Sequence, residues 1–182
     1  QEWLANILFL DPVPSRMRDY SFPADKRLLG DGRNLSSVLY SLWGKETDTI
    51  PPAKKKTRDQ LMSFIQSLPE QDISRIEFLA APRGEVMVQL VETFGGREIK
   101  YDASLLSDGT LRVLAIAAAM LSASEGSLVV IEEIDNGVHP SRAKHLLERI
   151  LDIANERNLR VLISTHNPAM LDALPDSAIQ DV

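Results

Sequence analysis

The chain has 182 residues, 44% of them hydrophobic, and its 26 acidic and 20 basic side chains give a net charge of −6. This length and composition are typical of one domain with a buried core, and they exclude a disordered tail. The chain has no cysteine, which excludes disulfides, thiolate zinc sites and a thiol nucleophile, and its negative charge argues against a broad polyanion-binding surface.

Nothing in the sequence predicts contact with a membrane. The apolar runs are far shorter than the ~20 residues that cross a bilayer, and residues 1–6 lack the basic segment that opens a signal peptide. Together with the absence of cysteine, this predicts a cytoplasmic protein without a membrane partner.

The start of the chain is predicted to hold one short strand and one helix. Residues 5–10 form an apolar run that Asp11-Pro-Val-Pro14 ends, as expected for a strand that enters a loop. Asn34 is placed to cap a helix whose apolar positions lie three and four residues apart, and Gly44 is placed to end it. A helix this short is stable only when it packs on other elements.

A second helix is predicted between a basic run and a proline. Thr57 and Gln60 have the spacing of a capping box, and apolar residues then recur on one face until Pro69. The run Lys54-Lys-Lys56 directly follows two prolines and contains no aromatic residue, which favours a solvated linker over a nucleic-acid contact. Residues 1–70 are accordingly interpreted as a helical, lid-like segment.

The periodicity then changes to that of strands. Residues 75–79 and 86–91 are strand-like, and Gly95-Gly96 offers a tight turn into a third strand over residues 97–101. We expect these strands to form a small antiparallel section within residues 71–105.

From Leu111 onward the pattern is regular α/β. An alanine-rich helix over residues 111–122 is followed by a strand over residues 128–131, a helix over residues 141–155 and a strand over residues 161–164. The apolar stripe of the helix that connects the two strands predicts that these strands are parallel, buried neighbours in one sheet.

Reactive side chains follow both of these strands. Glu132-Glu133 come directly after the first strand, and Ser164-Thr-His166 end the second. Ligands bind at the carboxyl ends of parallel strands, because loops and helix N-termini converge there, so we expect the acids and the imidazole to lie close together. Buried carboxylates are costly unless they are paired, and this pair therefore indicates a bound metal, a proton transfer, or both.

A helix N-terminus is expected to join these strand ends. Leu106-Ser-Asp-Gly-Thr110 opens the alanine-rich helix, so that Ser107 can cap it while its free backbone N–H groups and the positive end of its dipole form an anion site. Two acids, a histidine and a helix end that can bind phosphate point to nucleotide chemistry.

Four motifs resemble those of ABC-type ATPases. Residues 106–112 resemble the signature loop, residues 128–133 the Walker B strand, residues 136–140 the D-loop, and residues 164–166 the switch histidine. The residue pattern Glu132-Glu-Ile-Asp-Asn-Gly-Val-His-Pro140 is similar to the corresponding sequences of the SMC/RecF/OLD-like AAA ATPases of DNA repair and prokaryotic defence. This resemblance implies an α/β, P-loop NTPase-like fold with a parallel sheet core, helices on both faces and a small antiparallel section.

The resemblance also implies roles for individual residues. Glu133 falls on the general base that activates the attacking water, and His166 on the residue that contacts the γ-phosphate. Glu132 falls on the acid that holds Mg²⁺ through water. The implied contacts with ATP are at Ser107, Asp108, Gly109 and His139. In that family the signature loop completes the site of a partner protomer, so the resemblance implies a homodimer held together by ATP.

The chain departs from the family at one point, because it contains no Gly-rich loop that ends in Gly-Lys-Ser/Thr. Gly44-Lys45 is followed by Glu46 instead. Residues 1–182 are therefore interpreted as the C-terminal part of one ATPase domain, with the motifs in residues 106–182 and an incomplete N-terminal part. By itself this chain is expected to be inactive.

Alternative interpretations stay open. One is a metal-dependent nuclease or phosphoesterase, whose ligands would be Glu132, Glu133, Asp135, His139 and His166. Another is a non-catalytic interaction module on an ATPase scaffold. Ser107 alone is equally well explained as a helix cap, and His139 as a turn residue before a helix. The resemblance also suggests partners, namely DNA and a nuclease or other effector subunit.

Overall fold

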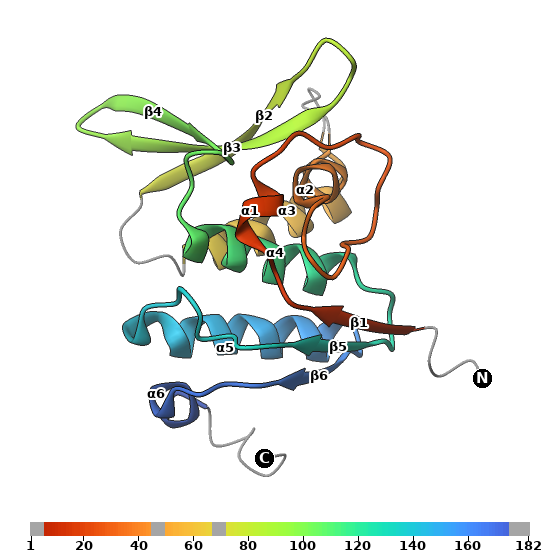
Figure 1. Ribbon diagram of the computed structural model, residues 1–182, viewed down its shortest axis with the longest axis vertical. Helices are drawn as coiled ribbons and strands as arrows, with labels where there is room; N and C mark the ends of the chain where they lie inside the picture. Colours follow the sequence, from red (N-terminus) through yellow and green to blue (C-terminus); the bar gives the residue numbers. More distant parts are fainter. Residues whose placement is uncertain (1–5, 45–49, 67–71, 175–182) are drawn as a thin grey trace.

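The computed structural model describes residues 6–44, 50–66 and 72–174. They form two three-stranded sheets, one parallel with the order β1-β5-β6 and one antiparallel with the order β2-β3-β4, with helices between them (Figure 1). The strands are β1 (Ile7–Leu10), β2 (Ile73–Ala80), β3 (Val86–Phe94), β4 (Arg97–Asp102), β5 (Leu128–Ile131) and β6 (Arg160–Ile163). The helices are α1 (Pro14–Met17), α2 (Leu35–Trp43), α3 (Pro52–Ile65), α4 (Asp108–Ser122), α5 (Pro140–Glu156) and α6 (Pro168–Asp172). The predicted α/β fold with a parallel core and an antiparallel section is confirmed.

The first strand belongs to the parallel sheet. β1 pairs in parallel with β5, and β5 pairs in parallel with β6, so that Leu10, Ile131 and Ile163 lie side by side at the carboxyl end. Residues 1–70 thus contain a core strand as well as helices. The division of the domain into segments 1–70, 71–105 and 106–182 stays a prediction. Within the described ranges, no helix combines the length and the apolar character needed to cross a membrane.

Helix α4 lies in the middle of the molecule, between the parallel sheet and helices α2 and α3 (Figure 1). From Leu111 to Leu121 all its residues except Arg112 are buried, as expected for a helix that is covered on all sides. Its alanines, among them Ala117 and Ala118, are small enough to let the neighbouring elements approach closely. The N-terminus of α4 is therefore held by a fully packed helix.

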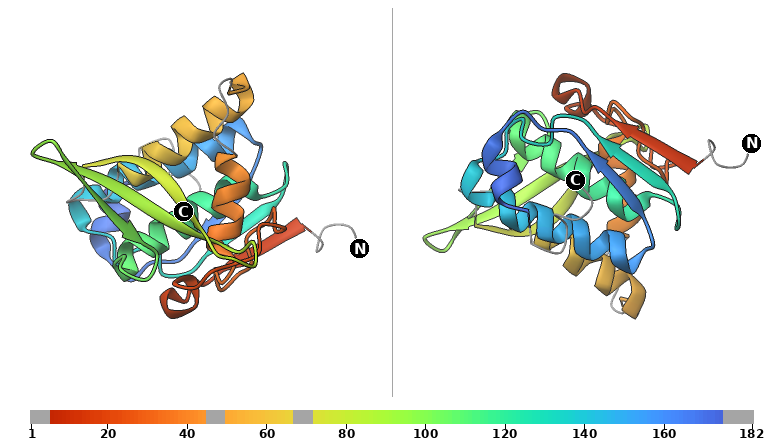
Figure 2. Two further views of the ribbon diagram at one scale, coloured as in Figure 1. Left: turned by 90° about the horizontal axis from the view of Figure 1, so that it is seen from above. Right: turned by 90° about the horizontal axis from the view of Figure 1, so that it is seen from below.

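The helices cover only one face of the parallel sheet in the described part of the chain. Side chains alternate between the two faces of a strand, and Leu10 of β1 and Ile131 of β5 are buried on the face toward α4. On the opposite face Phe9 and Leu162 are 62% and 60% exposed, and Figure 2, right, shows the strands of this sheet in front of α4. The resemblance implied helices on both faces, in line with the usual burial of parallel sheets, and the described residues supply helices for one face.

Helix α3 begins earlier than predicted. It starts at Pro52, a residue suited to the first turn of a helix because it lacks an N–H group, so Thr57 lies inside the helix and donates a hydrogen bond to the Ala53 carbonyl at 3.1 Å. The capping box and the solvated linker were therefore wrong. Lys54 donates from Nζ to the Ser41 carbonyl at 2.5 Å and stabilises the C-terminus of α2. Pro69, the predicted end of this helix, lies outside the described residues.

Asn34 precedes α2 as predicted, but its side chain does not cap the helix. Its Oδ1 accepts from the Leu29 amide at 3.0 Å, and its Nδ2 donates to Asp25 and to the Arg27 carbonyl, both at 3.0 Å. The side chain therefore holds the preceding loop. Gly44 ends the helix as predicted, with a positive φ of 76°.

Candidate functional site

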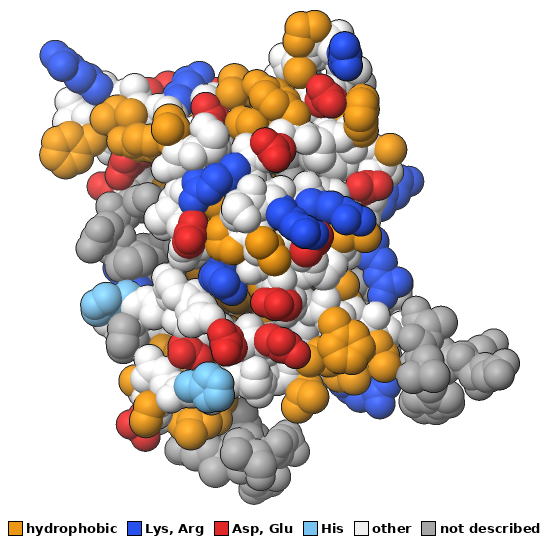
Figure 3. All heavy atoms as spheres, viewed as in Figure 1, with side chains coloured by type: hydrophobic (Ala, Val, Ile, Leu, Met, Phe, Trp, Pro, Cys, Tyr) orange, Lys and Arg blue, Asp and Glu red, His pale blue; other side chains and the backbone are white. Residues whose placement is uncertain are grey.

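The ends of β5 and β6 bring the predicted acid and imidazole together. Oε1 of Glu133 lies 3.7 Å from Nε2 of His166, and their side chains are 51% and 84% exposed. Acidic side chains lie next to a histidine on the lower half of the face shown in Figure 3. The expected proximity of the acid to the imidazole is confirmed. Both Glu132 and Glu133 are exposed instead of buried, so the predicted cost of removing their charges from water does not arise.

Glu133 has a backbone conformation that is unusual for a residue with a side chain. Its φ of 48° lies in the left-handed region, which costs about 1 kcal/mol or more for a residue other than glycine. Its amide donates to Oγ of Ser164 at 3.0 Å, and its Oε2 accepts from Nδ2 of Asn136 at 2.5 Å. These contacts fix both the backbone and the carboxylate, and such strain is found most often at functional sites.

Asp135 joins the two strand ends. Its Oδ1 accepts hydrogen bonds from Oγ1 of Thr165 at 2.5 Å and from the His166 amide at 3.4 Å. Partial burial pushes the pKa of Asp135 upward, but these hydrogen bonds and one from its own amide outweigh burial and hold the pKa below its ordinary value. The ionised carboxylate therefore fixes the backbone that carries His166. From the sequence, Asp135 was considered only as a metal ligand, and its role as a link between the strand ends was not predicted.

Glu132 continues the ladder of β1 and β5, because its amide donates to the Leu10 carbonyl at 3.1 Å. Among the described residues none donates a hydrogen bond to its exposed carboxylate, which borders a small crevice of about 10 Å³ together with Arg112 and Pro12. Mg²⁺ in nucleotide sites is held by one or two carboxylates, waters and the phosphates. A free carboxylate at a strand end fits this requirement.

The signature-like loop ends in a well-formed helix cap. Ser107 is the N-cap residue of α4, and its Oγ accepts from the Thr110 amide at 3.1 Å. Asp108 opens the helix and forms an ion pair with Arg18, with Nη2 to Oδ1 at 2.5 Å. Both side chains thus have partners within the same protomer, and the interpretation of Ser107 as a helix cap is confirmed.

Gly109 and Gly137 bring the signature-like loop and the D-loop-like segment into backbone contact. A Cβ atom added to Gly137 would lie 2.6 Å from Cα of Gly109 and 3.0 Å from its nitrogen, and φ of Gly137 is 79°. Only glycine permits both this conformation and this approach. A Cβ atom added to Gly109 would in turn clash with the carbonyl oxygen of Gly137, so this contact within the protomer requires glycine at position 109 as well.

His139 lies at the start of α5 and caps it. Its Nδ1 accepts from the Ser141 amide at 3.3 Å and lies 2.8 Å from Oγ of Ser141. This agrees with the interpretation of His139 as a turn residue before a helix. Its exposed ring leaves the implied contact with ATP a prediction.

The predicted residues do not form a ready-made metal cluster. Across the described residues, no group of three or more histidine, aspartate and glutamate side chains is arranged to hold a metal ion. The interpretation as a metal-dependent nuclease required such a cluster, so the geometry does not favour it.

Three comparisons relate this chain to known proteins. Residues 5–172 match the family described as "AAA domain, putative AbiEii toxin, Type IV TA system". An ATP/GTP phosphatase from Helicobacter pylori is 32% identical over 85 residues, 45% of this chain and 22% of that protein. The methionine import ATP-binding protein MetN from Staphylococcus saprophyticus is 34% identical over 91 residues, 49% of this chain and 26% of that protein.

The fold also has a counterpart among solved structures. The SMC head bound to the C-terminal winged-helix domain of ScpA superimposes with a TM-score of 0.52 at 11% identity, over 92% of this chain and 49% of that one. The matched stretches span about a quarter or less of the length of both curated relatives. The chain belongs to the AAA-domain family that it matches over residues 5–172, and its fold is that of the SMC head.

Proposed function

We propose that this chain supplies the signature loop, the Walker B acids, the D-loop and the switch histidine of an ATPase that hydrolyses ATP between two protomers. The observation that carries the proposal is the 3.7 Å approach of Glu133 to His166 at the ends of two adjacent parallel strands. A general base and a positioning group must both reach the attacking water, so they must lie this close together.

In this proposal Glu133 accepts the proton of the attacking water, and His166 donates a hydrogen bond to the γ-phosphate. Asn136 keeps the Glu133 carboxylate in place, and Asp135 does the same for the backbone of His166. Glu132 is the residue that would hold Mg²⁺, which when bound neutralises charge on the phosphates. The chain's own residues therefore orient the water and take up its proton.

The signature loop is proposed to act on the ATP of the partner protomer. Ser107 and the first free N–H groups of α4 form the positive end of a buried helix, which attracts a γ-phosphate. Asp108, Gly109 and His139 lie beside this surface in the proposal. Two such contacts, one from each protomer, would make ATP hold a homodimer together and hydrolysis release it.

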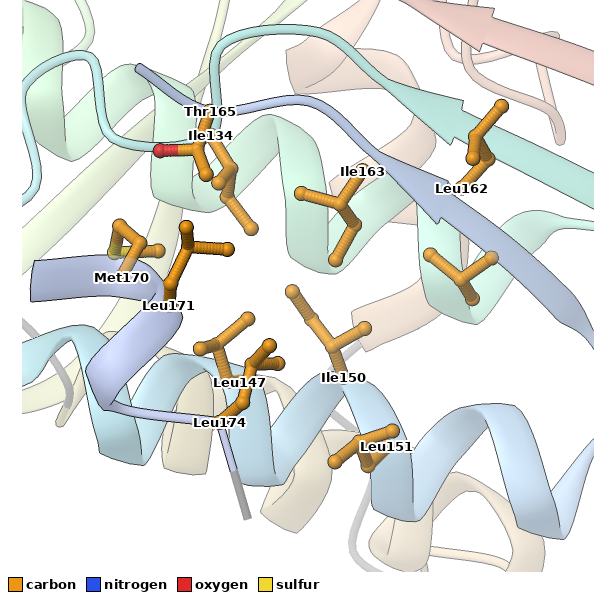
Figure 4. A pocket seen from close by; sticks show the side chains of 11 residues that line it. Ile134, Leu147, Ile150, Leu151, Leu162, Ile163, Thr165, Met170, Leu171 and Leu174 are labelled. Atoms are coloured by element: carbon orange, nitrogen blue, oxygen red, sulfur yellow. The ribbon is translucent and has the colours of Figure 1, made fainter. Parts of the chain in front are cut away.

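The P-loop is proposed to come from outside these 182 residues and to complete the parallel sheet beside β6. β6 ends the order β1-β5-β6, so one of its edges is unpaired within the described residues. Beside it lies an apolar cavity of about 410 Å³ between β6, α5 and α6, shown in Figure 4 with Ile163 and Ile150 on opposite walls. A strand and helix carrying the P-loop would cover this apolar surface, as parallel sheets require.

We propose that hydrolysis drives a DNA-repair or anti-phage defence complex. The family description names a type IV toxin–antitoxin system, and the sequence resembles ATPases of repair and defence. DNA and a nuclease or other effector subunit are the proposed partners. The cytoplasmic location and the inactivity of this chain by itself stay predictions.

The proposal is tested with Glu133→Gln in the full-length protein. The amide keeps the shape of the side chain but cannot accept the proton, so we expect ATP turnover to fall at least 100-fold, as for loss of a general base, while an ATP-dependent dimer accumulates. Glu125→Gln is the matched control, because Glu125 is exposed in the loop before β5, at the opposite end of the strand. Turnover at the parental rate in Glu133→Gln would remove Glu133 from the mechanism.

A further inference from the structure

Arg18 makes an unusual set of contacts with the loop that precedes α4. It lies at the C-terminus of α1, and its guanidinium donates to three backbone carbonyls and one carboxylate that are 85 to 90 residues away in the sequence. The acceptors are the carbonyls of Ala103 at 3.4 Å, Ser104 at 3.0 Å and Leu106 at 2.6 Å, and Oδ1 of Asp108 at 2.5 Å. One side chain thus holds the whole loop between β4 and the first turn of α4.

Arginine suits these contacts because Nη1 faces the three carbonyls, which share its two N–H groups, while Nη2 reaches Asp108. Its planar group presents five N–H donors in a fixed fork, whereas lysine offers a single point of charge. Because three carbonyls point toward Arg18, this one cation helps to fix the path of the loop up to Ser107, together with the hydrogen bonds from Ser104 to the Asp102 carboxylate. The Arg18 side chain is only 29% exposed, so its hydrogen bonds are partly shielded from water.

Arg18 also changes the charge at the start of α4. The Asp108 carboxylate is 70% exposed and directly follows Ser107, where a free negative charge would repel a phosphate. The ion pair with Arg18 offsets that charge and holds the carboxylate on the side of the loop where α1 ends. The geometry gives Asp108 a partner within its own protomer.

We propose that Arg18 is a positioning residue of the signature loop. It neutralises Asp108 and holds the loop in the conformation that receives the γ-phosphate bound by the partner protomer. This inference rests on the proposed function. It predicts that loss of Arg18 harms the site of the opposite protomer and leaves the protomer's own site intact.

The first test measures dimer formation by light scattering in full-length Glu133→Gln protein, as a function of ATP concentration. Arg18→Ala should raise the ATP concentration for half-maximal dimer roughly tenfold or more, the effect of losing charge-assisted hydrogen bonds, and Arg18→Lys should restore only part of it. Arg16→Ala is the matched control, because Arg16 lies two residues away and pairs with Asp31. Unchanged dimer formation in Arg18→Ala would overturn the inference.

A second test separates positioning from a folding defect. Full-length Arg18→Ala and Glu133→Gln proteins are mixed, and ATP turnover is measured at an ATP concentration too low for Arg18→Ala to dimerise by itself; Glu133→Gln alone lacks the general base. In the mixed dimer one site has an intact Glu133 and faces an intact signature loop, so turnover should return. If Arg18 served its own protomer's site, both sites would be defective and mixing would restore nothing, which would overturn the inference.

Ser107→Ala distinguishes failure of the inference from failure of the proposed function. If Ser107→Ala weakens the ATP-dependent dimer and Arg18→Ala does not, the role of Arg18 is wrong and the signature loop stands. If the parental protein neither hydrolyses ATP nor dimerises with it, the proposed function fails and the inference fails with it.

Discussion

The contact between Gly109 and Gly137 can be tested with a single methyl group. In Gly137→Ala the new Cβ would lie 2.6 Å from Cα of Gly109, a distance at which one of the two segments must move. Such overpacking costs about 1–3 kcal/mol, and alanine at a φ of 79° adds about 1 kcal/mol. We therefore expect Gly137→Ala to lose about 2–4 kcal/mol of unfolding free energy.

Gly126→Ala separates the two causes. Gly126 has nearly the same φ, 76°, but a Cβ atom there would meet nothing within 4 Å, so only the cost of backbone conformation, about 1 kcal/mol, should remain. Urea unfolding of the two variants and the parent gives both values. An equal loss in Gly137→Ala and Gly126→Ala would show that the signature-like loop and the D-loop-like segment are not in contact.

Three further predictions follow from single contacts. Asn136→Ala should lower ATP turnover about tenfold without unfolding the protein, because the Glu133 carboxylate loses the donor that orients it; an unchanged rate would refute this. Asp135 has a lowered pKa, so its contribution to stability is present above its unfolded pKa of about 3.9 and is lost as pH falls through the folded pKa; Asp135→Asn should weaken the fold at pH 7 and flatten its acid unfolding curve. Lys54→Met should cost about 1 kcal/mol in thermal unfolding through the lost cap of α2, whereas Lys55→Met, at an exposed position of the same helix, should cost less.

Elements with a strong local pattern could be predicted from the sequence. β5 occupies residues 128–131 as expected, because four apolar residues followed by two acids leave little choice of boundary. The turn at Gly95-Gly96 was also predicted, because glycine readily adopts positive φ angles. Both residues have positive φ in the structure.

Boundaries that depend on competing local signals were less certain. The spacing of Thr57 and Gln60 imitates a capping box, but the helix is covered by α2 and α4 and extends back to Pro52, because packing outweighs a local cap. Asn34 likewise stands where a cap belongs, and its side chain is used by the preceding loop. Tertiary contacts decided both positions.

The site was predictable where strand order alone determines it. The approach of Glu133 to His166 follows from two parallel neighbours that end at the same edge. The contacts of Arg18 with the loop before α4 were not predictable, because they join residues 85 or more positions apart and no periodic pattern signals them. Asp135 could have been assigned as a link, since it lies two residues after Glu133 and faces the end of β6.

Glu133 and His166 are proposed to act together on one water and one phosphate. Its most direct test is a double-mutant cycle in which single-turnover ATP hydrolysis by the full-length protein is measured for Glu133→Gln, His166→Ala and the double variant. Residues that work as a unit give non-additive effects, so the double variant should be no slower than the slower single variant. Losses that multiply would mean that the two residues act independently, and would contradict the claim.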